Sequence, residues 1–141
     1  MSHRITRTHE IACGHRVVGH ESKCRSLHGH NYGFALTCTA EALDELGRVI
    51  DFAVIKARLC QWLEDEWDHR LLLWEQDPLL PTLRSLDHSV VALGFNPTAE
   101  NLAAYLVEVV GPALLAHTGV RLIACTVQET AKCSATYEAP P

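Results

Sequence analysis

The sequence of 141 residues predicts an α+β fold: an antiparallel four-stranded sheet with two helices packed on one face. Segments in which apolar and polar residues alternate, as they do in half-buried strands, lie towards both ends of the chain. Segments with apolar residues at helical spacing lie between them. Strands grouped at the ends around central helices indicate a sheet that is covered by helices on one side.

The predicted strands differ in how clearly they alternate. The second strand is the clearest, because Tyr32, Phe34, Leu36 and Cys38 share one of its sides. A turn at residues 44–47 precedes a short return strand. In chain order, we expect strands at residues 3–12, 30–40, 48–50, 120–129 and 133–138.

Two helices are predicted in the middle of the chain, over residues 51–67 and from about 98 to 119. Asp51 is expected to cap the first helix, and a glycine is expected to end the second. Residues 70–96, between the helices, show no clear periodicity. We therefore expect an irregular segment there, with a partly helical stretch near residues 81–86.

Composition and charge exclude several classes of protein. The formal net charge of −5 at pH 7 argues against a nucleic-acid partner that is bound through a basic surface. The sequence has no run of 18 apolar residues and begins without an apolar signal segment, so we expect no membrane partner and a cytoplasmic location. Because no repeat or linker divides it, residues 1–141 are predicted to form one domain.

The six cysteines show no C-x-x-C spacing, which predicts free thiols rather than a disulfide framework in a reducing compartment. Cys38, Cys60 and Cys125 lie in apolar or strand-like surroundings and are expected in the core.

Three histidines have the spacing of metal ligands. His28 and His30 are two residues apart where a strand begins, so their side chains project from one face. His15, near the end of the first predicted strand, offers a third imidazole. Three histidine ligands suit Zn²⁺ with a fourth position open, which is the catalytic arrangement. The alternative is that His28 and His30 are ordinary surface histidines.

Cys24 is the candidate base or nucleophile. Lys23 and Arg25 flank it, and neighbouring cations favour the thiolate form of a cysteine. The alternative is that Cys24 is a fourth zinc ligand, which would give a closed structural site.

Two further segments carry candidate acids and bases. Asp68 and His69 close the first predicted helix, where a histidine also complements the helix dipole. Glu129 lies on the same side of its predicted strand as Cys125 and Val127, so its carboxylate could be partly buried and could accept two N–H bonds from a flat, guanidine-like ligand edge. The alternatives are a structural helix-terminal histidine and an exposed glutamate at a strand end.

Taken in order, these segments resemble the 6-pyruvoyl-tetrahydropterin synthase / 6-carboxytetrahydropterin synthase family. The matching segments are A-C-G-H-R at 12–16, C-R-S-L-H-G-H at 24–30, V-I-D-F at 49–52, W-D-H at 67–69, N-P-T-A-E-N-L-A at 96–103 and Q-E-T at 128–130. They span nearly the whole chain in the family's order. Three residues separate Cys24 from His28, so the chain looks like the branch of queuosine biosynthesis, because the biopterin-forming branch usually has a longer gap.

The resemblance implies roles for the candidate residues. The implied site comprises the zinc ligands His15, His28 and His30 and the catalytic residues Cys24, Asp68, His69 and Glu129. Cys24 would be the base, His69 with Asp68 its relay partner and proton donor, and Glu129 the anchor of the pterin. The family's tunnelling fold closes a β-barrel from three subunits, and two trimers form a homohexamer with active sites between subunits.

The implied reaction converts 7,8-dihydroneopterin triphosphate to 6-carboxy-5,6,7,8-tetrahydropterin, acetaldehyde and triphosphate. Two alternatives stay open at this point. One is a 6-pyruvoyl-tetrahydropterin synthase, which would release triphosphate without acetaldehyde. The other is a non-catalytic zinc-binding oligomer in which Cys24 is a ligand. The sequence also departs from the family's pattern, because Cys13 adds a thiol near the first zinc ligand and the segment 70–96 is longer than in compact members.

Overall fold

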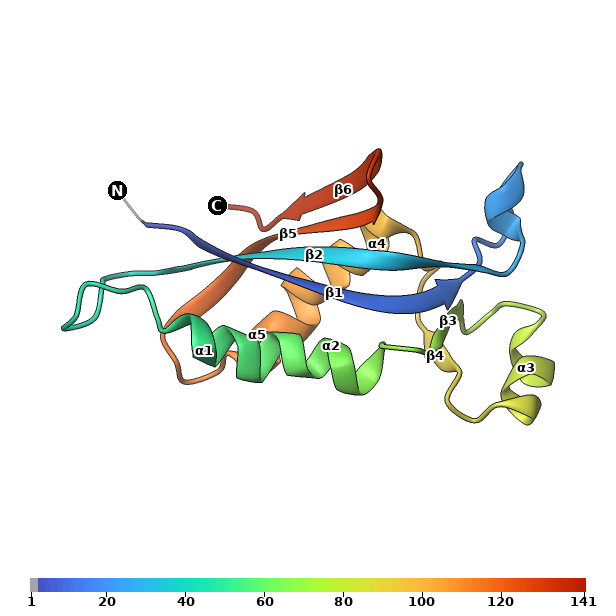
Figure 1. Ribbon diagram of the computed structural model, residues 1–141, viewed down its shortest axis with the longest axis horizontal. Coiled ribbons are helices and arrows are strands. Elements are labelled where there is room, and N and C mark those ends of the chain that lie inside the picture. Colours follow the sequence, from blue (N-terminus) through green and yellow to red (C-terminus); the bar gives the residue numbers. More distant parts are fainter. Residues whose placement is uncertain (1–2) are drawn as a thin grey trace.

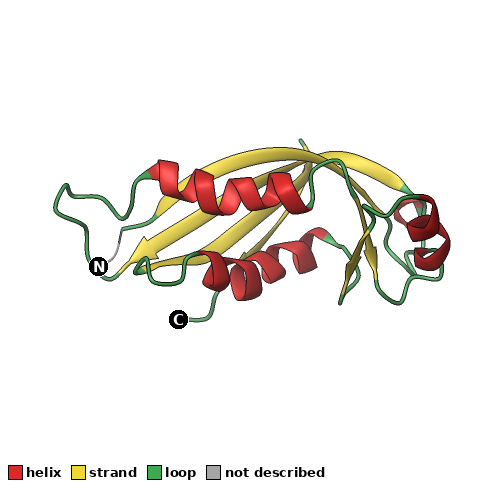
Figure 2. Cartoon of the chain, turned by 90° about the horizontal axis from the view of Figure 1, so that it is seen from below, coloured by secondary structure: helices red, strands yellow, loops and turns green. Residues whose placement is uncertain are grey.

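The computed structural model describes residues 3–141, so the first two residues of the predicted domain lie outside the described part. Its main feature is a curled sheet that is covered on one face by two long helices (Figures 1 and 2). The sheet has six strands in the order β4-β3-β1-β2-β5-β6. They are β1 (Ile5–His15), β2 (His28–Ala40), β3 (Leu71–Trp74), β4 (Val91–Leu93), β5 (Val120–Thr130) and β6 (Cys133–Glu138).

The prediction of a four-stranded antiparallel sheet is therefore wrong in strand number and in direction. Four strands, β1, β2, β5 and β6, pair antiparallel as expected, but β3 pairs parallel to β1, and β4 pairs parallel to β3. The two additional strands come from the segment that was predicted to be irregular. They are four and three residues long, too short for a two-residue period to stand out in the sequence.

The predicted return strand at residues 48–50 is also absent from the structure. The Asp44 carboxylate accepts hydrogen bonds from the backbone N–H groups of Leu46 and Arg48, both at 2.9 Å. These bonds hold the chain in a turn, and the guanidinium of Arg48 donates to the same carboxylate. Turn chemistry thus overrides the strand propensity of the valine and isoleucine that follow.

The two long helices begin close to the predicted positions, and the first also ends where expected, but the second ends at Leu114, five residues before the glycine that was predicted to end it. The first consists of α1 (Phe52–Ile55), a π-helical stretch (Lys56–Cys60) and α2 (Gln61–Glu66). The second consists of α4 (Ala99–Tyr105), a π-helical stretch (Leu106–Val110) and α5 (Gly111–Leu114). Asp51 and Thr98 cap them by accepting from Ala53 N and Asn101 N. A third helix, α3 (Leu80–Leu86), lies where partial helicity was expected. No helix within residues 3–141 is long and apolar enough to cross a membrane.

The core lies between the helices and one face of the sheet. All four side chains expected on one side of β2 (Tyr32, Phe34, Leu36 and Cys38) are buried there. In β5 the alternation shifts, because Ile123 forms a bulge opposite residues 37 and 38 of β2. In a regular strand, Cys125 and Val127 would lie on the face opposite to Leu122. The bulge brings them to the core face, so that all three side chains are buried. Glu129 consequently continues the core face of β5 towards the open end of the sheet.

Candidate active site

Three histidines meet where β1 ends and β2 begins. His15 is the last residue of β1 and pairs in register with His28, the first residue of β2. His30 follows on the same face of β2, as the two-residue spacing predicted. One potential ligand nitrogen from each ring lies within 4.8 Å of the others. The sheet register therefore brings together the three residues that were predicted as metal ligands.

Backbone carbonyl groups fix the orientation of two of these rings. His15 Nδ1 donates to Pro97 O at 2.6 Å, and His28 Nδ1 donates to Ser26 O at 2.7 Å. A carbonyl oxygen only accepts, so each Nδ1 carries a proton, and in the neutral form of each ring Nε2 presents a lone pair. The two Nε2 atoms lie 3.1 Å apart. Histidine ligands of metals are commonly oriented by such a hydrogen bond from the other ring nitrogen.

Burial favours the neutral, cation-binding form of two of the three rings, His15 and His30. The His15 side chain is buried, and this burial lowers its pKa from 6.5 to about 4, against the opposing effect of its hydrogen bond to Pro97. Burial also lowers the pKa of His30, with Glu129 opposing. His30 Nε2 is a buried polar atom with no hydrogen-bond partner among the described residues. Neutral imidazoles and an unpartnered nitrogen at one point fit a bound divalent cation.

The composition of the histidine group bears on the role of Cys24. Within residues 3–141, no fourth His, Cys, Asp or Glu joins the three histidines at ligand distance. Cys24 lies in the short helical turn Lys23–Arg25 between β1 and β2, and its side chain is half-buried. Three ligands with an open position match the catalytic form of a zinc site rather than the closed form.

Glu129 lies beside the histidine group on the neighbouring strand. Its Oε2 is 3.9 Å from His30 Nε2, and its side chain is 22% exposed. It also lines a small cleft of about 200 Å³ together with Glu100 at the start of α4 and Ser134 at the start of β6. The carboxylate is thus partly buried, as the alternation predicted, and it is accessible to a ligand beside the histidines.

Asp68 and His69 form the expected pair, but on the other face of the sheet. His69 Nδ1 lies 2.9 Å from Asp68 Oδ2, and Asp68 Oδ1 accepts from Ala12 N. His69 has a positive φ of 59° and an 80% exposed side chain. It lines an open pocket of about 550 Å³ that includes Ala12, Gly14, Gly29 and Asn31, at the positions of β1 and β2 that face away from the core, although Cys13 and His30 also line it. Within one chain, the pair and the histidine group therefore open on opposite sides of the sheet.

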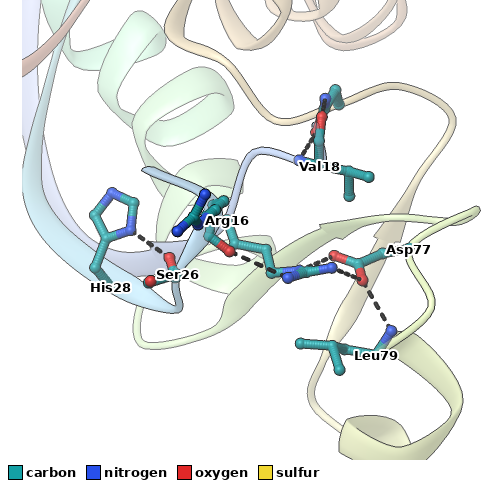
Figure 3. Close-up of polar contacts among 8 residues, drawn as sticks. Arg16, Val18, Ser26, His28, Asp77 and Leu79 are labelled. Atoms are coloured by element: carbon teal, nitrogen blue, oxygen red, sulfur yellow. Dashed lines mark hydrogen bonds and ion pairs between the residues drawn. The ribbon is translucent and has the colours of Figure 1, made fainter. Parts of the chain in front are cut away.

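Two residues near the site were missed in the sequence. Arg16 and Asp77 form an ion pair with contacts of 2.7 and 2.9 Å next to the turn that carries Cys24 (Figure 3). Arg16 belongs to one of the matching motifs, but nothing in the sequence indicated its partner. Asp77 lies in the segment without periodicity, so only the folded chain reveals it.

Comparisons with known proteins identify the class to which this fold and site belong. Residues 4–140 match the model of the 6-pyruvoyl tetrahydropterin synthase family, and the chain belongs to this family. It is 33% identical over 132 residues to a 6-carboxy-5,6,7,8-tetrahydropterin synthase of Rickettsia typhi, covering 92% of this chain and 96% of that protein. It is 40% identical over 113 residues to the synthase of the same name from Rickettsia bellii, covering 79% and 82%.

Solved structures support the fold. An uncharacterized protein of Wolinella succinogenes superposes with a TM-score of 0.87 at 23% identity, covering 99% of both chains. The 6-pyruvoyl tetrahydropterin synthase of Caenorhabditis elegans superposes with a TM-score of 0.71 at 24% identity, covering 99% of this chain and 97% of that one. The curled mixed sheet and the helices on one of its faces are thus the fold of this family.

Proposed function

We propose that this protein is a zinc-dependent 6-carboxytetrahydropterin synthase, a carbon–carbon lyase. It converts 7,8-dihydroneopterin triphosphate to 6-carboxy-5,6,7,8-tetrahydropterin, acetaldehyde and triphosphate, and the balance of atoms requires one water. The observation that supports the proposal most directly is the group of three buried or half-buried histidines whose ring nitrogens converge without a fourth protein ligand among residues 3–141. The names of the curated relatives favour the carboxy product.

His15, His28 and His30 would hold the metal ion through their Nε2 atoms. Once bound, Zn²⁺ would polarise the side-chain oxygens of the substrate and make the adjacent C–H bond more acidic. Glu129 would accept two N–H bonds from the amino-pyrimidinone edge of the pterin, because its partly exposed carboxylate lies on the strand beside the ligands. These contacts fix the pterin with its side chain over the histidine group.

Cys24 would act as the base. Its thiolate takes the proton from the substrate side chain, and β-elimination then expels triphosphate. Water then adds to the carbonyl carbon next to the pterin ring, and retro-aldol-type cleavage of the adjacent carbon–carbon bond gives the carboxylate and, after protonation of the released fragment, acetaldehyde. His69, held by Asp68, would relay protons to and from Cys24 and supply the proton that the leaving group needs. General acid–base catalysis of this kind contributes about 10²–10⁴-fold in rate.

The position of His69 requires more than one chain for this mechanism. Because the Asp68–His69 pair opens on the sheet face opposite to the histidine group, His69 of one subunit would serve the Cys24 of another. Both ends of the sheet, β4 and β6, also carry unpaired edges that a neighbouring subunit can cover. We infer a homohexamer built as a dimer of trimers, each chain one synthase domain over residues 1–141, in the cytoplasm and in a pathway to queuosine.

The decisive experiment measures acetaldehyde from 7,8-dihydroneopterin triphosphate with the zinc-loaded protein, by coupling its formation to NADH oxidation through alcohol dehydrogenase. We expect acetaldehyde and triphosphate in equal amounts. Triphosphate without acetaldehyde would indicate a 6-pyruvoyl-tetrahydropterin synthase. The Cys24→Ala variant should keep its zinc and lose about 10²–10⁴-fold in turnover. Full turnover in that variant would contradict the role of Cys24.

A further inference from the structure

The turn that carries Cys24 is held at three successive carbonyl groups. Cys24 O accepts from the backbone N–H of Val17 at 2.8 Å, and Ser26 O accepts from His28 Nδ1 at 2.7 Å. Between them, Arg25 O accepts from Arg16 Nη1 at 3.1 Å. The ends of β1 and β2 thus fix the turn on both sides of Arg25, and Figure 3 shows Arg16 and the Ser26–His28 bond side by side.

The remaining donors of Arg16 bind one carboxylate. Arg16 Nε lies 2.7 Å from Asp77 Oδ2, and Nη2 lies 2.9 Å from Oδ1 (Figure 3). The Asp77 side chain is fully buried, and its Oδ1 also accepts from the backbone N–H of Leu79 at 2.8 Å. Burial alone would raise the pKa of Asp77, but the hydrogen bonds from Arg16 and Leu79 lower it below its usual value. A buried, bidentate pair has far more geometric specificity than an exposed one.

Asp77 connects the turn of Cys24 to the segment 70–96, which the sequence did not relate to the site. The segment is tied to the end of β1 a second time, because the Asn96 side chain accepts from Val18 N and donates to Val18 O at 3.0 and 2.8 Å. Arg16 and Val18 follow directly after β1, whose last residue is His15. The segment 70–96 therefore holds the chain just after β1 at two points, Arg16 and Val18. This part of the chain in turn holds the turn that carries Cys24.

We propose that Arg16 and Asp77 are a positioning pair for Cys24 and for the ligand His28. Asp77 orients the guanidinium, the guanidinium holds Arg25 O, and the turn so fixed places Cys24 on one side and the Ser26 carbonyl, which orients the His28 ring, on the other. In this role the pair acts through the turn and not on the substrate. The catalytic part of this role rests on the proposed function, whereas the effect on metal affinity and on the Cys24 thiol does not.

The test compares Arg16→Lys and Asp77→Asn with Arg48→Lys, a matched control in an exposed pair with Asp44. Lysine keeps the charge of Arg16 but cannot bind the carboxylate and Arg25 O in one plane. We expect both site variants to bind Co²⁺ about tenfold more weakly, the lower end of the effect of outer-shell partners. We also expect iodoacetamide to alkylate Cys24 faster in these variants, as measured by mass spectrometry. In turnover assays we expect a loss in kcat with little change in KM. The control should match the wild type in each measurement.

A double variant keeps the test informative if the single variants fail to fold. Arg16→Met with Asp77→Leu replaces the buried pair by apolar side chains, which restores stability in many proteins. A folded double variant should still show weaker Co²⁺ binding and faster alkylation of Cys24. If the variants that fold bind Co²⁺ and react with iodoacetamide at Cys24 as the wild type does, the proposal is overturned. A change in melting temperature alone would not support it. Absence of turnover in the wild type would reject the proposed function and leave the Co²⁺ and alkylation measurements valid.

Discussion

The Nε2 atoms of His15 and His28 lie 3.1 Å apart, while the Nδ1 atom of each ring donates to a backbone carbonyl. In neutral rings, two lone pairs therefore face each other at the distance of a hydrogen bond without a proton between them. Zn–N bonds of about 2.0–2.1 Å would place two ligand nitrogens of one ion about 3–4 Å apart. The two lone pairs repel each other when no cation is bound, and both are attracted to a cation placed between them. The fold thus holds the two rings in an arrangement that suits a shared metal ion.

We expect His28→Ala to abolish metal binding. The zinc content should fall from about one ion per chain to near zero, because two imidazoles without a third ligand hold Zn²⁺ weakly. His88→Ala, at an exposed position outside the histidine group, should keep the full content. In the wild type, Zn²⁺ at a hundred times its dissociation constant should also stabilise the fold by about 2.7 kcal/mol. Equal zinc content in His28→Ala and His88→Ala would contradict the assignment.

We expect Cys24→Ala and His69→Ala to be inactive alone and active in mixed oligomers. In one chain, His69 lies on the sheet face opposite to the histidine group, so a complete site would take Cys24 and His69 from different subunits. Random mixing in equal amounts leaves about one quarter of the sites with both residues intact. Co-refolded variants with different affinity tags, purified through both tags, should recover about a quarter of wild-type turnover. Mixed oligomers without recovery would place both residues in one subunit's site.

Much of this site could be predicted from the sequence, and the remainder could not for identifiable reasons. The spacing of His28 and His30 fixes their common face because strand geometry has a period of two. The face of His69 could not be predicted, because it depends on a left-handed backbone at a non-glycine residue. The partner of Arg16 was hidden because Asp77 belongs to a turn, and a turn carries no periodic signal.

The same reasons explain the strands that were missed. Leu71–Trp74 is a run of apolar residues that sequence periodicity cannot distinguish from a helical turn, and Val91–Leu93 is shorter still. They become strands only because β1 offers a parallel edge at Gly14 and His15. Tertiary pairing decides such segments, whereas the eleven and thirteen residues of β1 and β2 show their alternation locally.

The thiols should divide sharply in reactivity. Cys133 is exposed and Cys24 is half-buried, whereas the other four cysteines are buried. Under reducing storage and then at neutral pH, a chromogenic disulfide reagent should titrate two thiols rapidly in the native protein and all six after unfolding. Rapid reaction of a third thiol would show that one of the buried cysteines becomes accessible by local opening.

Stability should fall at alkaline pH for a related reason. Burial raises the pKa of Cys125 from 9.0 to about 12, so the folded state keeps a proton that the unfolded chain releases above pH 9. The stabilisation is complete below pH 9 and is lost as the pH rises towards 12. Between pH 8 and 10.5, this thiol should cost on the order of 2 kcal/mol of unfolding free energy. Urea unfolding at both pH values should show that the wild type loses more unfolding free energy than Cys125→Ala between pH 8 and 10.5, by about that amount. Equal losses in the two proteins would contradict the prediction.

Gly111 should resist replacement by alanine although it lies inside a helix. A Cβ atom at this position would lie 2.9 Å from Leu122 Cβ and 3.0 Å from Leu106 O, neither of which is the end of a flexible side chain. Alanine gains about 1 kcal/mol of helix propensity, whereas overpacking costs about 1–3 kcal/mol. We therefore expect Gly111→Ala to lower the free energy of urea unfolding by about 1 kcal/mol. Val109→Ala, at a 52% exposed position on the same helix, should change it by less. If Gly111→Ala were as stable as the wild type, the helix could move away from β5 at little cost, and close helix–sheet contact would not be what selects glycine here.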